Sequence, residues 1–131
     1  MPVDIHRLPD EKIIITDVTN PLNVDTGMGT IFQDTHALRE SIGAHAVIIY
    51  NTTALDVNFG DLMLSMAEHA KGVPGSVTDP HLTPLIVTTD DLLATAVGAM
   101  KQPRYGAIEV RVFPTLDQAL AAAREIARTL P

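Results

Sequence analysis

The segment AVIIYN, residues 46–51, decides the fold of this chain. It places five apolar residues in succession, and Val47, Ile48 and Ile49 are β-branched. Successive side chains of a strand point to opposite faces of its sheet, so an uninterrupted apolar strand must be covered on both sides. Asn51 ends the run with a polar turn former. The segment therefore predicts the central strand of a sheet that lies between two layers.

Three further stretches have the composition of strands. Residues 13–15 and 85–87 are also continuously apolar and predict buried neighbours of the central strand. Residues 108–112, in contrast, alternate between apolar and charged side chains. Alternation is typical of a strand with one wet face, so we expect this last strand at the edge of the sheet.

Helical patterns separate the strands. Thr30 with Gln33, and Thr115 with Gln118, have the spacing of capping boxes that begin helices, and two more helices are expected from Asn58 and after Asp90. The pattern predicts an α/β fold with a four-stranded, mostly parallel sheet and alternating helices. Residues 12–131 are expected to form a single domain. Residues 1–11 are interpreted as a lead-in that either docks as an edge or stays mobile, residues 27–29 as a hinge, and residues 72–84 as a mobile loop.

Composition and charge exclude several classes of function. The chain has 131 residues, no cysteine and a net charge of −7. Between positions 13 and 100 it has ten acidic residues but only two basic ones. A basic stripe that could bind nucleic acid is absent from the sequence. The apolar runs are much shorter than the roughly 20 residues that cross a bilayer. We therefore expect no nucleic-acid partner, no membrane insertion and a cytoplasmic location.

Polar residues follow the three buried strands and should meet at one edge of the sheet, because parallel strands share their carboxyl ends. Carboxylates and hydroxyls there could hold Mg²⁺ through oxygen ligands. The alternative is that these residues cap helices and form turns, which we favour. The residues are Asp17, Asn51, Thr88, Thr89, Asp90 and Asp91.

Residues 12–128 resemble the STAS superfamily in its SpoIIAA-like branch, the fold of anti-sigma factor antagonists and of many small bacterial proteins. The resemblance rests on residues 46–51, the helix from Asn58, residues 85–87 and, above all, the strand, turn and helix of residues 110–120. It implies binding to a protein partner. In such proteins a partner kinase phosphorylates a serine in the turn after the second strand. That serine is missing here, because the corresponding turn reads Asn58-Phe59-Gly60-Asp61-Leu62. Asn58, Gly60 and Asp61 are therefore expected to belong to a partner rim without a phosphorylation switch.

The sequence favours a non-enzymatic module that binds a protein partner or a small apolar ligand, with no catalytic residue, metal or cofactor. A Mg²⁺-dependent phosphotransfer or hydrolytic enzyme that uses the acidic rim is the alternative. A homodimer is a further possibility, because the exposed edge of the last strand could pair with that of a second copy.

Overall fold

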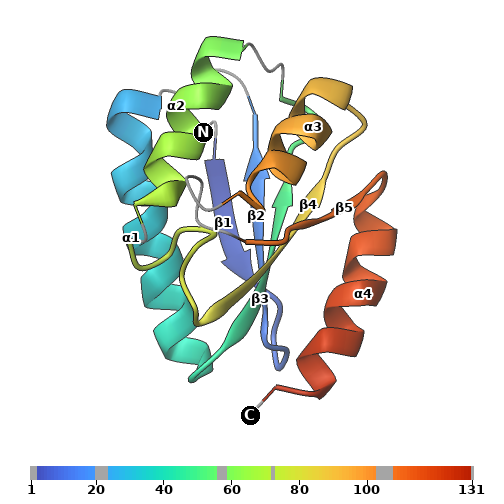
Figure 1. Cartoon of the computed structure of the whole chain (residues 1–131). Helices are drawn as coiled ribbons and strands as arrows, with labels where there is room; N and C mark the ends of the chain where they lie inside the picture. Colours follow the sequence, from blue (N-terminus) through green and yellow to red (C-terminus); the bar gives the residue numbers. More distant parts are fainter. Residues whose placement is uncertain (1–2, 20–23, 56–58, 72, 103–107, 131) are drawn as a thin grey trace.

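A computed structural model describes residues 3–19, 24–55, 59–71, 73–102 and 108–130; within these ranges the side chains of residues 24–28, 59, 61, 62 and 70 are not described. Within these ranges, five strands and four helices follow one another (Figure 1). The elements are β1 (Val3–Arg7), β2 (Ile13–Val18), α1 (Val24–Ile42), β3 (Ala46–Asn51), α2 (Phe59–Ala70), β4 (Leu82–Val87), α3 (Asp91–Ala99), β5 (Arg111–Phe113) and α4 (Leu116–Arg128).

The sheet is mostly parallel, as predicted, but it has five strands instead of four. Its order is β1-β2-β3-β4-β5, with β1 antiparallel to β2 and every other pair parallel. The extra strand lies in the segment interpreted as a lead-in, and of the two alternatives left open there the structure shows an edge strand. The last strand lies at the other edge, as expected. It covers only the end of the predicted segment.

Two layers of helices cover the sheet unequally. Of the described helices, α1, α2 and α3 lie together on one side of the sheet, and α4 lies on the other (Figure 1). The three crossovers all step in the same direction across the sheet, so their right-handedness places their helices on the same face. Within β2, Ile14 points to the three-helix side, while Ile13 and Ile15 point to α4. This division explains why β2, β3 and β4 are apolar on consecutive positions.

α1 begins earlier than the sequence indicated. The hinge predicted at residues 27–29 is wrong, because these residues lie inside the helix. A glycine within a helix costs about 1 kcal/mol relative to alanine. Ile31 and Phe32 pack against Val3 and Ile5 of β1, and we attribute the persistence of the helix to this tertiary packing.

The segment between α2 and β4 is irregular, as predicted, but it is shorter than predicted and it is anchored. Residues 82–84, which were expected in the loop, form the beginning of β4. The buried carboxylate of Asp79 accepts hydrogen bonds from the backbone N–H groups of Gly75 (2.9 Å) and His81 (2.8 Å). Gly75 has a φ of +93° and lies so close to α1 that a Cβ atom there would overlap the carbonyl oxygen of Phe32. These contacts contrast with the mobile loop that the sequence predicted.

Candidate functional site

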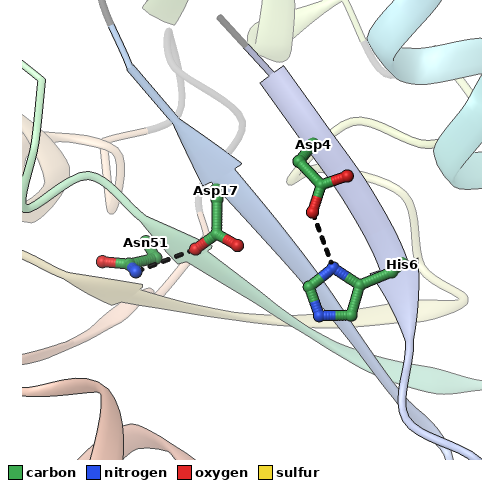
Figure 2. Close-up of polar contacts among 4 residues, drawn as sticks. All are labelled: Asp4, His6, Asp17 and Asn51. Carbon is green, nitrogen blue, oxygen red and sulfur yellow. Dashed lines mark hydrogen bonds and ion pairs between the residues drawn. The ribbon is translucent and has the colours of Figure 1, made fainter. Parts of the chain in front are cut away.

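The carboxyl ends of the parallel strands meet at one edge of the sheet, where polar side chains were expected to converge. The register aligns Asp17 of β2 with Asn51 of β3, and Asn51 with Val87 of β4. The Nδ2 group of Asn51 donates a hydrogen bond of 2.8 Å to Oδ1 of Asp17 (Figure 2). The structure thus brings these two predicted residues into direct contact.

Asn51 is held in a single orientation by the turn that follows it. Its Oδ1 accepts a hydrogen bond from the hydroxyl of Thr53 at 3.0 Å and is 3.4 Å from the backbone nitrogen of Thr53. Since the carbonyl end of the amide is occupied in this way, the NH₂ end faces Asp17. Asn51 therefore fixes the position of the Asp17 carboxylate.

The antiparallel strand β1 adds two residues to this edge. Asp4 pairs directly with Asp17 in the register of β1 and β2, and the next side chain on the same face of β1 is His6. The Nδ1 atom of His6 lies 3.2 Å from Oδ2 of Asp4 (Figure 2). One ligand atom from each of Asp4, His6 and Asp17 lies within 4.8 Å of the other two. Sequence reasoning missed Asp4 and His6 because their segment was not recognised as a strand.

These four residues, Asp4, His6, Asp17 and Asn51, form what we call the polar half-face. It lies on the α4 side of the sheet, since Asp17 and Asn51 alternate in phase with Ile15 and Ile49 of the α4 core. α4 packs mainly over β3, β4 and β5 and lies far from β1 (Figure 1). The side chains of Asp4 and His6 are consequently 71% and 44% exposed. One half of this sheet face is apolar and covered, and the other half is polar and open.

Four other predicted rim residues, Thr88 to Asp91, lie between the end of β4 and the first turn of α3. Thr88 is buried and its hydroxyl accepts a hydrogen bond from the N–H of Asp90, while Oδ1 of Asp90 accepts one from the N–H of Leu93 and caps α3. Thr89 is exposed, as is Asp91 in the first turn of α3. The interpretation of Thr88 and Asp90 as turn and capping residues therefore fits the structure.

The turn that resembles the phosphorylation motif is only partly described. Gly60 is exposed in the first turn of α2. Asp61 lies in the same turn, but its side chain is outside the description, and Asn58 is outside the described residues altogether. The structure therefore assigns no role to this turn.

A second polar group lies under the three-helix layer. The imidazole of His69 contacts the rings of Phe32 and Tyr50, with centroid distances of 5.0 Å and 5.9 Å, and its Nδ1 accepts a hydrogen bond of 3.1 Å from the N–H of Val77. Burial lowers the pKa of His69 to about 4, against an opposing effect of the Glu68 carboxylate. Burial also raises the pKa of Tyr50, and Asp79 adds to this effect. Both groups are therefore neutral near pH 7.

A shallow hollow of about 320 Å³ lies beside the amino end of β2. Five of the six residues that line it are charged, and Arg124 forms a 2.9 Å ion pair with Glu11 there. The residues are Asp10, Glu11, Lys12, Arg124, Ala127 and Arg128. Such a lining does not suit a small apolar ligand.

The architecture is that of the SpoIIAA-like fold. The chain is similar to an uncharacterised DUF3478-family protein of this fold from Shewanella loihica PV-4, with a TM-score of 0.54 over 92% of this chain and 91% of the other. The two sequences are 13% identical, so the likeness concerns the fold alone. No family model matches the chain, and no curated protein does. Among the described residues, no helix is both long and apolar enough to cross a membrane.

Proposed function

We propose that this chain is a non-enzymatic binding module that docks a protein partner on its polar half-face. The observation that carries the proposal is the uneven cover of the sheet. α4 encloses the apolar half of its face, and the half that carries Asp4, His6 and Asp17 is left open although its side chains are ordered by hydrogen bonds. Ordered, exposed polar groups on a rigid strand pair suit recognition, because little conformational entropy is lost when a partner binds.

The described residues give catalysis less support than binding. The sequence has no cysteine, and the hydroxyl of Thr88 is buried in the turn that leads into α3. Among the described residues of the acidic rim on which the Mg²⁺-dependent enzyme was based, Asp17 and Asn51 are the pair joined by a hydrogen bond on this face. We therefore favour the binding module over the enzyme.

The charges of the polar half-face indicate the chemistry of the partner. Asp4 and Asp17 are directly opposite across the β1 and β2 pair, an arrangement in which like charges repel. Neither forms an ion pair with a lysine or arginine among the residues that the structure describes. A guanidinium group can donate hydrogen bonds to both carboxylates. The occupant that we propose is a protein segment that presents arginine.

Fluorescence anisotropy with a short labelled arginine-containing peptide tests the proposal, with a glutamine-for-arginine peptide as the comparison. In the double variant Asp4→Asn/Asp17→Asn we expect about tenfold weaker binding at low salt, since two exposed charge pairs contribute roughly 1.4 kcal/mol together. The control Asp34→Asn/Asp117→Asn changes two exposed residues of α1 and α4 and gives the same net charge. Equal losses in both variants, or no binding by the unmodified chain, would refute the proposal.

We also propose homodimerisation at the opposite edge of the sheet as a second mode of association. β5 is an edge strand of three residues, and Val112 within it is 39% exposed. Edge strands offer unpaired backbone groups to a second strand. Light scattering over a dilution series should then show a dimer that dissociates on dilution, and a constant monomeric mass would exclude it.

A further inference from the structure

We propose that Asp4, His6 and Asp17 form a binding site for a divalent transition-metal ion, with Zn²⁺ as the representative cation. The inference goes beyond the docking of a protein partner and does not require one. It rests on the convergence of three ligand-bearing side chains from two paired strands, at positions set by the backbone register.

The spacing of the ligand atoms fits such an ion. Protein ligands lie about 2.1 Å from Zn²⁺, so two ligands of a tetrahedral site are roughly 3.4 Å apart. Oδ2 of Asp4 and Nδ1 of His6 are 3.2 Å apart. One ligand atom from each of Asp4, His6 and Asp17 lies within 4.8 Å of the other two, and Figure 2 shows the three side chains on neighbouring strands. A bound ion would draw the three ligand atoms closer, to three vertices of a tetrahedron, and water would supply the fourth ligand.

The kind of ligand selects the class of metal. Two carboxylates balance the charge of a divalent ion, and the bound ion would relieve the repulsion between Asp4 and Asp17. Imidazole favours Zn²⁺ and its neighbours in the transition series, whereas Mg²⁺ and Ca²⁺ prefer oxygen ligands alone. We therefore expect clear selectivity for Zn²⁺ over Mg²⁺.

Asn51 acts as a positioning residue for this site. Its amide donates to Oδ1 of Asp17 and leaves the other carboxylate oxygen available toward His6 (Figure 2). Hydrogen-bond partners of metal ligands commonly change metal affinity 10- to 100-fold when they are removed, so Asn51→Ala should weaken binding about tenfold. It should also alter the visible spectrum of bound Co²⁺, a signature that a purely structural role would leave unchanged.

Isothermal titration calorimetry on the complete chain without any peptide tests the inference. We expect one Zn²⁺ per chain, with affinity reduced at least about 100-fold in His6→Asn and in Asp17→Asn, because each removes one of three ligands. The matched control is His36→Asn, which removes a half-buried histidine of α1 that is paired with Glu40 at 2.7 Å. Circular dichroism and urea unfolding should show that the variants keep their fold. Should Asp17→Asn fail to fold, His6→Asn decides the question, because the side chain of His6 is 44% exposed.

Three results would overturn the inference: no Zn²⁺ binding, equal loss in His36→Asn, or Mg²⁺ binding as tight as Zn²⁺ binding. The outcome is separable from that of the proposed docking function, because peptide binding is measured in the presence of EDTA. Zinc binding without peptide binding would remove only the docking proposal. Peptide binding without zinc binding would remove only the metal site.

Discussion

The neutral histidine under the three-helix layer predicts how the stability of the protein depends on pH. His69 lies in the last turn of α2, and its Nδ1 accepts the N–H of Val77 from the irregular segment. Burial holds its pKa at about 4 in the folded chain, compared with about 6.5 in an unfolded one. Protonation therefore favours the unfolded state, and acid should weaken the attachment of this segment to α2.

The size and the sign of the effect follow from proton linkage. A difference of about 2.5 in pKa corresponds to roughly 3 kcal/mol, at 1.36 kcal/mol for each unit. We treat this value as an upper limit, because His69 keeps partial contact with solvent. The contribution of the neutral His69 side chain to the free energy of unfolding is complete above about pH 6.5, falls as the pH declines toward 4, and is lost below that value.

Urea unfolding at a series of pH values between about 7 and 4 measures this contribution. His69→Asn removes the titration, while the Oδ1 atom of asparagine can still accept the N–H of Val77. Its stability should fall less steeply with acid than that of the unmodified chain, by up to about 3 kcal/mol over the series. A smaller slope should persist, since burial and His81 also lower the pKa of His45. His36→Asn, on the surface of α1, is the control; an unchanged slope in His69→Asn would refute the reasoning.

Two further substitutions test the packing of the irregular segment and the capping of α4. In urea unfolding, Gly75→Ala should lower the free energy of unfolding by about 3 kcal/mol, because the positive φ adds strain and the new Cβ overlaps the backbone of Phe32. Gly43→Ala should lower it by roughly 1 kcal/mol, because Gly43 has a φ of +144° but open space around it. Thr115→Ala removes the acceptor of the Gln118 N–H and should lower the free energy of unfolding by about 1 kcal/mol. The control Thr95→Ala changes an exposed threonine of α3 and should change the stability by less than about 0.5 kcal/mol. Equal melting temperatures for the two variants would contradict the capping role of Thr115.

The pattern of apolar residues along the sequence made most of the fold predictable. The apolar run around Ile48 can only lie in the middle of a covered sheet, and the alternation near Val112 indicated the open edge that β5 forms. Two of the predicted caps are confirmed, since Asp90 and Thr115 accept the backbone N–H groups that their spacing required. The cap predicted at Thr30 is wrong, because Thr30 lies inside α1. β1 escaped recognition because it has only two apolar side chains, Val3 and Ile5. Their alternation with Asp4 and His6 was the signal that could have revealed it.

The candidate site was half predictable for the same reason. Asp17 and Asn51 could be expected to meet because parallel strands share their carboxyl ends, and they form a hydrogen bond. Asp4 and His6 reach the site only through the antiparallel register of β1, which depends on tertiary pairing rather than on local sequence. Thr88 was predicted at the same edge, but its hydroxyl serves the turn before α3.

The solitary position of α4 affects how the chain folds as it is synthesised. Every strand pairs with a neighbour in the sequence, so the sheet can assemble progressively while the ribosome is still adding residues, together with α1, α2 and α3. The opposite side of the sheet stays uncovered until α4 emerges; its residues include Ile13, Val47 and Leu85. A nascent chain that stalls before α4 is complete exposes a large apolar surface to chaperones or to other incomplete chains. The docking of α4 therefore removes the apolar surface through which such chains would aggregate.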